Sequence, residues 1–125
     1  MTLNFNFELE GKRSPWGRIQ HAYTVAHGIF LTSTSSHGGV KLDRERNALV
    51  DPLWRKPGGW YEGDCEWAIV ALTFPSVPYF AEAVGPDNET RIHYALRSAK
   101  NYRPEDLAAV FPRLDRYPYA EEIKK

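Results

Sequence analysis

Residues 64–72 read DCEWAIVAL and form the most apolar part of the chain once their acidic beginning is passed. Asp64 is a good helix N-cap, because its carboxylate accepts hydrogen bonds from the free N–H groups of a first turn. Trp67–Leu72 leaves almost no polar face, and a helix that is apolar all round is buried. We therefore expect a central buried helix that ends before Pro75. A buried strand over Trp67–Leu72 is the alternative.

Strand patterns precede this helix. Asn4–Glu10 alternates polar and apolar residues, as a half-buried strand does. Gly17–Thr24 and Gly28–Thr34 are rich in β-branched and aromatic residues, and their junction at His27 and Gly28 predicts a β-hairpin. Ser33–Gly39 is expected to be a turn-rich loop whose two glycines permit positive φ.

Helical patterns occupy most of the remaining chain. Asp43 is expected to cap a short helix that ends before Pro52, and Asn88 to cap a longer one over Glu89–Tyr102. Pro104 suits the first turn of a further short helix, which Pro112 ends.

Strands first and helices later predict an α+β fold, namely a small antiparallel sheet of about three strands with three to four helices packed on one face. The chain has 125 residues, the usual size of one domain, so we expect a single domain over residues 1–125. Its tail from about Tyr117 is expected to be loosely held.

Composition narrows the class of protein. The chain is 42% hydrophobic and 14% aromatic, which is enough to form a hydrophobic core without disulfides or bound metals. Its only cysteine is Cys65, so an internal disulfide is excluded. The net charge is zero, with a balance of +3 over residues 1–60 and −3 over residues 61–125. A nucleic-acid binder normally has a basic excess, so we do not expect nucleic acid as a partner.

The sequence begins without the basic and apolar run of a signal peptide. Its longest apolar run, Trp67–Leu72, is far too short to cross a bilayer. We therefore expect a cytoplasmic protein with no membrane partner.

The common short catalytic and nucleotide-binding motifs are absent, and no cofactor is expected. One segment that stands out is SHGGVKL, residues 36–42. Glycines after His37 let backbone N–H groups approach an anion or a partner chain, and His37 itself can act as acid, base or ligand. The alternative is an ordinary glycine-rich turn in which His37 bonds to a neighbouring carbonyl.

The other segment is GWYEGDCEW, residues 59–67. Its carboxylates and thiol make Glu62, Asp64 and Cys65, together with His37, weak candidates for a metal site. Cys65 near a helix start would also have a lowered pKa, which makes Cys65 and His37 a candidate nucleophile and base. The alternative is ordinary helix-start chemistry with Cys65 as a small hydrophobe.

Both segments, with Pro15–Arg18 before them and Asp43–Asn47 between them, resemble a domain of unknown function that we associate with bacteriophages, plasmids and other mobile elements. The likeness covers about residues 15 to 75. Where that family prefers a second acidic residue after Glu62, this chain has Gly63, which counts against a metal site there. The resemblance implies that the chain is a small accessory protein of a mobile element, and such proteins often inhibit host defence.

Three hypotheses follow for the function. The first is a cytoplasmic inhibitor, of anti-CRISPR or anti-restriction type, that binds a bacterial host defence protein. Aromatic residues are favoured at interface cores, and this chain has spare ones at Trp16, Trp54, Trp60, Tyr61 and Tyr79. Its predicted contact surface consists of His37, Gly38, Gly39, Lys41, Trp60, Tyr61, Glu62 and Asp64.

The second hypothesis is a small enzyme, or a metal or nucleotide binder, that uses His37 and the segment Glu62–Cys65. The third is a DNA-binding regulator that reads DNA with Arg91, Arg97 and Lys100, which are expected to face outward from the helix over Glu89–Tyr102. The neutral net charge opposes this hypothesis.

Overall fold

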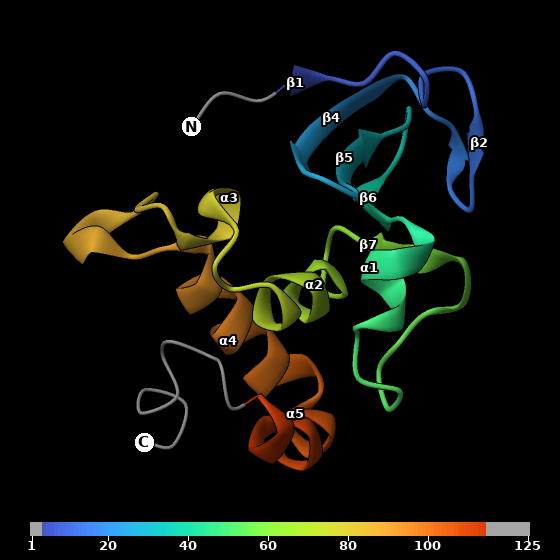
Figure 1. Ribbon diagram of the computed structural model, residues 1–125. Coiled ribbons are helices and arrows are strands. Elements are labelled where there is room, and N and C mark those ends of the chain that lie inside the picture. The colour runs from blue at the N-terminus through green and yellow to red at the C-terminus, as the bar shows by residue number, and fades with distance from the viewer. Residues whose placement is uncertain (1–3, 115–125) are drawn as a thin grey trace.

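The structure is a computed structural model that describes residues 4–114 (Figure 1). Its main feature is a five-stranded antiparallel sheet in the order β1-β4-β5-β6-β7. The strands are β1 (Asn4–Phe5), β4 (His21–Ala26), β5 (Ile29–Ser33), β6 (Gly38–Leu42) and β7 (Trp60–Glu62). A separate two-stranded ribbon is formed by β2 (Arg13–Ser14) and β3 (Gly17–Arg18).

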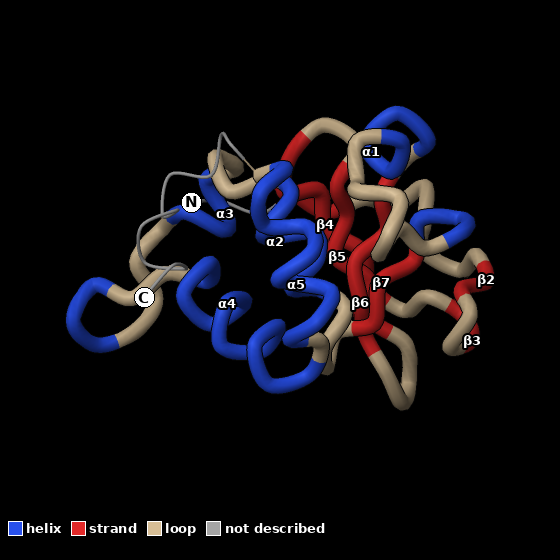
Figure 2. Tube along the Cα trace, turned by 90° about the horizontal axis from the view of Figure 1, so that it is seen from below, coloured by secondary structure: helices blue, strands red, loops and turns tan. Residues whose placement is uncertain are grey.

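The helices gather on one side of this sheet, as Figure 2 shows. They are α2 (Trp67–Thr73), α3 (Pro78–Ala81), α4 (Arg91–Tyr102) and α5 (Pro104–Val110), while α1 (Arg44–Ala48) follows the end of β6. Three short 3-10 turns complete the described chain, η1 (Pro57–Gly59), η2 (Pro86–Asn88) and η3 (Phe111–Arg113). The predicted α+β class with helices beside an antiparallel sheet is confirmed, but the sheet has more strands than the three expected. None of the helices in residues 4–114 is long and apolar enough to cross a bilayer.

The central helix is the predicted one. Ala68–Leu72 of α2 is completely or almost completely buried, and α2 contacts β6 and β7 on one side and α4 on the other. The strand alternative is therefore wrong. The expected N-cap is also wrong, because α2 begins two residues later, with Glu66 at the N-cap and Asp64 exposed in the preceding turn.

Strand register sorts the side chains of the sheet onto two faces. Tyr23, Leu31, Val40 and Tyr61 pair in a row across four strands, so they share one face. This face turns toward the helices and forms the main core, in which Val40 and Tyr61 are buried. The opposite face carries a second, smaller buried group, Ile19, Ala22 and Thr32, which the segment before β4 covers.

The predicted hairpin of residues 17–34 is confirmed in part. β4 and β5 pair around a turn in which Gly28 has φ +79°, but Gly17 and Arg18 pair with β2 instead. The half-buried strand predicted over Asn4–Glu10 is wrong. Only Asn4–Phe5 pairs with β4, and the chain then turns.

Two predicted helix starts have different outcomes. Asp43 caps α1 as expected, because its carboxylate accepts a hydrogen bond from the Arg46 N–H at 2.8 Å. Asn88 does not cap α4, since it lies in η2 with φ +61°. Thr90 is the N-cap, and the His93 ring accepts from the Thr90 N–H to complete a capping box. Farther on, the predicted short helix after Pro104 is α5, in which Leu107 and Val110 are buried. The tail from Tyr117 lies outside the described residues.

Candidate functional site

Strand pairing places the two conspicuous sequence segments side by side. Gly39 pairs with Glu62 and Lys41 with Trp60, while the Gly63 N–H donates to the Gly38 carbonyl at 2.8 Å. The paired residues are 19 or more positions apart in sequence, yet the two segments form one edge of the sheet. This edge is the only place where residues 36–42 and 59–67 meet through strand pairing in the part of the chain that the structure describes.

His37 lies at the exposed tip of the tight turn before β6. Thr34 holds this turn, because its N–H donates to the His37 carbonyl at 2.7 Å and its hydroxyl accepts from the His37 N–H at 3.1 Å. The His37 ring is left free to face solvent, with Nδ1 only 3.0 Å from Ser36 Oγ. Residues 4–114 contain no hydrogen bond between His37 and Cys65.

The glycines after His37 have a role that differs from the predicted one. Gly38 and Gly39 belong to β6 and do not have positive φ. A Cβ at Gly39 would lie 2.4 Å from Trp16 Cη2 and 2.4 Å from the Tyr61 carbonyl oxygen. The glycine is therefore needed for close packing, since it lets an aromatic ring lie directly on the strand.

Trp16, Lys41 and Trp60 form a cluster on the sheet face opposite the helices, which we call the tryptophan face. The Trp16 and Trp60 rings meet edge to face with centroids 5.8 Å apart, and Lys41 Nζ lies 4.9 Å from the Trp60 ring centroid. Lys41 Nζ also donates to the Gly58 carbonyl. Partial burial lowers the pKa of Lys41, and the nearby Asp43 carboxylate opposes this effect. All three side chains are half-buried and so remain partly open to a partner.

Two aromatic residues of the predicted contact surface are inside the protein. Tyr61 is fully buried; its hydroxyl donates to Asn47 Oδ1 at 2.5 Å and accepts from the Lys56 N–H at 3.1 Å. Burial raises the pKa of Tyr61. Trp54 is 2% exposed, and its indole nitrogen has no hydrogen-bond partner among residues 4–114. Neither side chain is available to a partner in this structure.

The acidic segment divides into exposed and anchored carboxylates. Asp64 is exposed and Glu62 half-buried, whereas Glu66 forms an ion pair with Lys56 at 2.5 Å and lies 3.8 Å from Arg103. Burial by itself would raise the pKa of Glu66, but the Lys56 hydrogen bond, the Glu62 N–H and the charges of Lys56 and Arg103 together lower this pKa. Glu66 therefore connects the loop between β7 and α2 to Lys56 on one side and to Arg103 on the other.

The weak metal candidates do not assemble into a site. No group of three or more His, Cys, Asp or Glu side chains within residues 4–114 is placed so that it could hold a metal ion. Cys65 is half-buried in the loop before α2, and His37 is on the exposed turn. What the structure does bring together at β6 and β7 is a set of aromatic rings, one amine, the half-buried Glu62 and the exposed Asp64.

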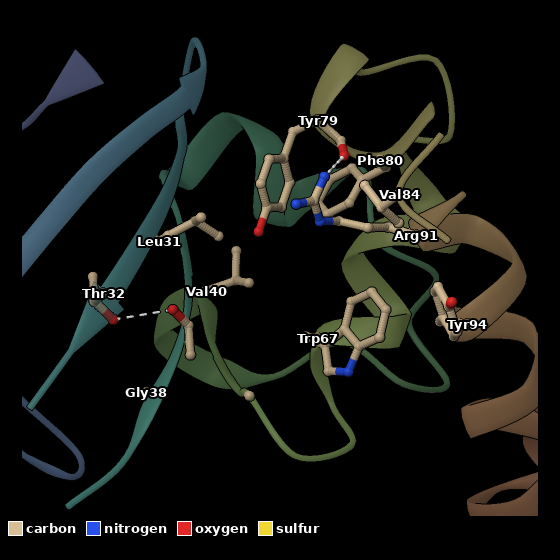
Figure 3. Close-up of a pocket in the computed structure, with 12 residues that line it drawn as sticks. Leu31, Thr32, Gly38, Val40, Trp67, Tyr79, Phe80, Val84, Arg91 and Tyr94 are labelled. Atoms are coloured by element: carbon tan, nitrogen blue, oxygen red, sulfur yellow. Dashed lines mark hydrogen bonds between the residues drawn. The ribbon is translucent and has the colours of Figure 1, made fainter. Parts of the chain in front are cut away.

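A cavity of about 540 Å³ lies on the other side of β6, between the sheet and the helices (Figure 3). Its floor is Leu31, Val40 and the backbone of three glycines, and its far wall comes from α2, α3 and α4. The lining residues are Leu31, Thr32, Gly38, Gly39, Val40, Gly63, Trp67, Tyr79, Phe80, Val84, Arg91 and Tyr94.

Sequence reasoning did not predict this cavity. Gly38 and Gly39 were singled out for their backbone, and Tyr79 as a spare aromatic, but nothing in the sequence places Arg91 beside Tyr79. Arg91 was expected to face outward from its helix. It lies instead over the Tyr79 ring, 3.8 Å from the ring centroid.

A family model described as a domain of unknown function, DUF7007, matches residues 9–120. The chain belongs to this family. The match includes both the tryptophan face and the residues that line the cavity. No curated protein and no solved structure gives a significant match.

Proposed function

We propose that this DUF7007 protein is a small accessory protein of a mobile genetic element that binds and inhibits a bacterial host defence protein in the cytoplasm. The observation that carries the proposal is the pairing of β6 with β7. It gathers Lys41, Trp60 and Glu62 from two distant segments on one sheet face, where Trp16 joins them.

The composition of this face suits a protein interface. Tryptophan is among the residues most enriched at binding hot spots, because one side chain combines a large apolar area with a polar N–H group. Trp16 and Trp60 are held in place by each other and by the sheet, so little side-chain entropy is lost on binding. The exposed His37 and Asp64 supply a polar rim at the end of the same two strands. The proposed surface thus keeps most predicted residues, loses Tyr61 and gains Trp16.

The charges of α4 favour this proposal over the DNA-binding alternative. Arg91 and Arg97 were two of the three basic residues expected to read DNA. Each is paired with a carboxylate, Arg91 with Glu82 at 2.7 Å and Arg97 with Glu89. A helix face neutralised in this way attracts the phosphate backbone weakly.

The test is a plating assay in bacterial strains that each carry one CRISPR or restriction system active against a phage. Expression of the chain should restore plating of the phage in at least one strain, and the defence protein of that strain should co-purify with the chain. Trp60→Ala and Lys41→Ala should abolish both effects. His27→Ala is the matched control, because His27 is exposed in the turn between β4 and β5 and does not belong to the tryptophan face.

Two results would contradict the proposal. One is failure to restore plating in any strain of the panel by a chain that is expressed and folded. The other is full activity of Trp60→Ala, which would remove the tryptophan face from the interaction.

A further inference from the structure

The cavity between the sheet and the helices has the size and character of a small-molecule site. Its volume of about 540 Å³ is within the usual range of ligand pockets. Trp67, Tyr79 and Tyr94 contribute aromatic walls, and Leu31 and Val40 an apolar floor. Such walls fit a flat ring, which can pack against aromatic faces and edges.

Two polar side chains of this cavity, Arg91 and Trp67, can only donate hydrogen bonds. Arg91 is the only charged residue that lines the cavity within residues 4–114, and no carboxylate does so. Neither a guanidinium nor an indole contains an acceptor atom, so the side chains of Arg91 and Trp67 can only donate hydrogen bonds. In the same part of the chain the Trp67 indole makes no hydrogen bond. The Tyr79 hydroxyl points into the space between Val40 and Trp67 (Figure 3).

The guanidinium of Arg91 is held with one edge free. Nη1 makes both of its hydrogen bonds within the protein, to the Tyr79 carbonyl at 2.8 Å and to Glu82 Oε1 at 2.7 Å. Nε and Nη2 make none to any residue from 4 to 114. These two nitrogens lie on the cavity side of the group in Figure 3. Two parallel N–H bonds on one guanidinium edge match the two oxygens of a carboxylate.

We propose that this cavity binds a small aromatic carboxylic acid. The carboxylate accepts two hydrogen bonds from Nε and Nη2 of Arg91, and the ring lies between Trp67 and the floor of Leu31 and Val40. Stacking on Tyr79 and the bonds of Nη1 hold the guanidinium in position before the ligand arrives. The cavity is on the helix side of the sheet, opposite the tryptophan face, so this proposal does not depend on the proposed function.

The test uses 1-naphthoate as the probe and its neutral analogue 1-naphthamide as the comparison, titrated into ¹⁵N-labelled full-length protein. Trp67→Phe assigns the Trp67 indole resonance among those of the four tryptophans. We expect 1-naphthoate to shift the Trp67 resonance and to leave that of Trp16 in place. The carboxylate should bind at least tenfold more tightly than the amide, because a charge-assisted pair is stronger than a neutral one.

Three variants test the role of the guanidinium edge. Arg91→Gln should weaken 1-naphthoate binding at least tenfold. Glu82→Gln removes the same internal ion pair but keeps the guanidinium, so it should bind at least as well as the unaltered protein. Lys100→Gln changes the net charge equally on the same helix, but Lys100 is exposed and does not line the cavity, so this variant should have no effect.

The proposal is overturned if 1-naphthamide binds as tightly as 1-naphthoate, if the Trp67 resonance does not move, or if Arg91→Gln binds the carboxylate unchanged. The comparison of the two probes uses the unaltered protein, so it decides the matter even where Arg91→Gln does not fold.

Discussion

Trp16 lies edge to face against Trp60, with ring centroids 5.8 Å apart and ring planes at 90°. The first ring comes from the turn between β2 and β3 and the second from β7, so this contact attaches the N-terminal ribbon to the edge of the main sheet. It also requires Gly39 beneath Trp16, because a side chain there would occupy the space of the ring.

Gly39→Ala should destabilise the protein by about 2 kcal/mol or more, as overpacking of a tight site does. The new methyl group meets the Tyr61 carbonyl oxygen, which is backbone and does not move cheaply. Urea denaturation measures the loss. Gly38→Ala is the matched control with a smaller expected effect, since its Cβ would lie 3.1 Å from the nearest atom. Equal stability of Gly39→Ala and the unaltered protein would contradict the packing of Trp16 on β6.

Tyr61→Phe should lower the free energy of unfolding by about 1–2 kcal/mol, because Asn47 and the Lys56 N–H lose their shared buried partner. Tyr79→Phe is the control, since the Tyr79 hydroxyl makes no hydrogen bond within residues 4–114 and its removal should change stability little. The two variants are compared by thermal and urea unfolding. A larger loss for Tyr79→Phe than for Tyr61→Phe would refute this assignment.

Glu66→Gln should destabilise the protein at neutral pH by about 1 kcal/mol, the scale of a partly exposed ion pair with hydrogen bonds. The pKa of Glu66 is lowered in the folded state. Its contribution is therefore present above the unfolded pKa of about 4.5 and is lost as the pH falls through the lower folded pKa. The stability curves of the variant and the unaltered protein should converge in acid. Glu8→Gln, at an exposed turn, is the control and should leave the free energy of unfolding at neutral pH nearly unchanged.

Asp43→Ala should cost about 1 kcal/mol, the usual value of an N-cap, because α1 loses the bond from the Arg46 N–H. Asp64→Ala should cost almost nothing, since Asp64 does not cap α2. Both aspartates precede a helix in the sequence, but only Asp43 caps one in the structure. Comparing the two variants therefore tests the observed caps against those that the sequence pattern predicts. A greater loss from Asp64→Ala would place the start of α2 two residues earlier than it is here.

Local sequence patterns were sufficient to predict the elements that are stabilised mainly by neighbouring residues. The β4–β5 hairpin, the Asp43 cap and the apolar run of α2 all depend on contacts within a few residues, and the structure confirms them. The predicted caps at Asp64 and Asn88 were wrong because several polar residues precede each helix, and local sequence does not decide at which of them the helix begins. Glu66 and Thr90 hold the N-cap positions instead.

The sequence by itself determined the α+β class, the buried central helix and the two segments with unusual chemistry. Only the tertiary structure decided that β6 pairs with β7, which places Trp60 beside Lys41 and turns Tyr61 inward. Strand pairing between distant segments decides which face each side chain occupies, and a register shift of one residue would exchange the two faces. The placement of Arg91 over Tyr79 has the same kind of cause. It results from the packing of α3 against α4, a contact between elements that no local spacing encodes.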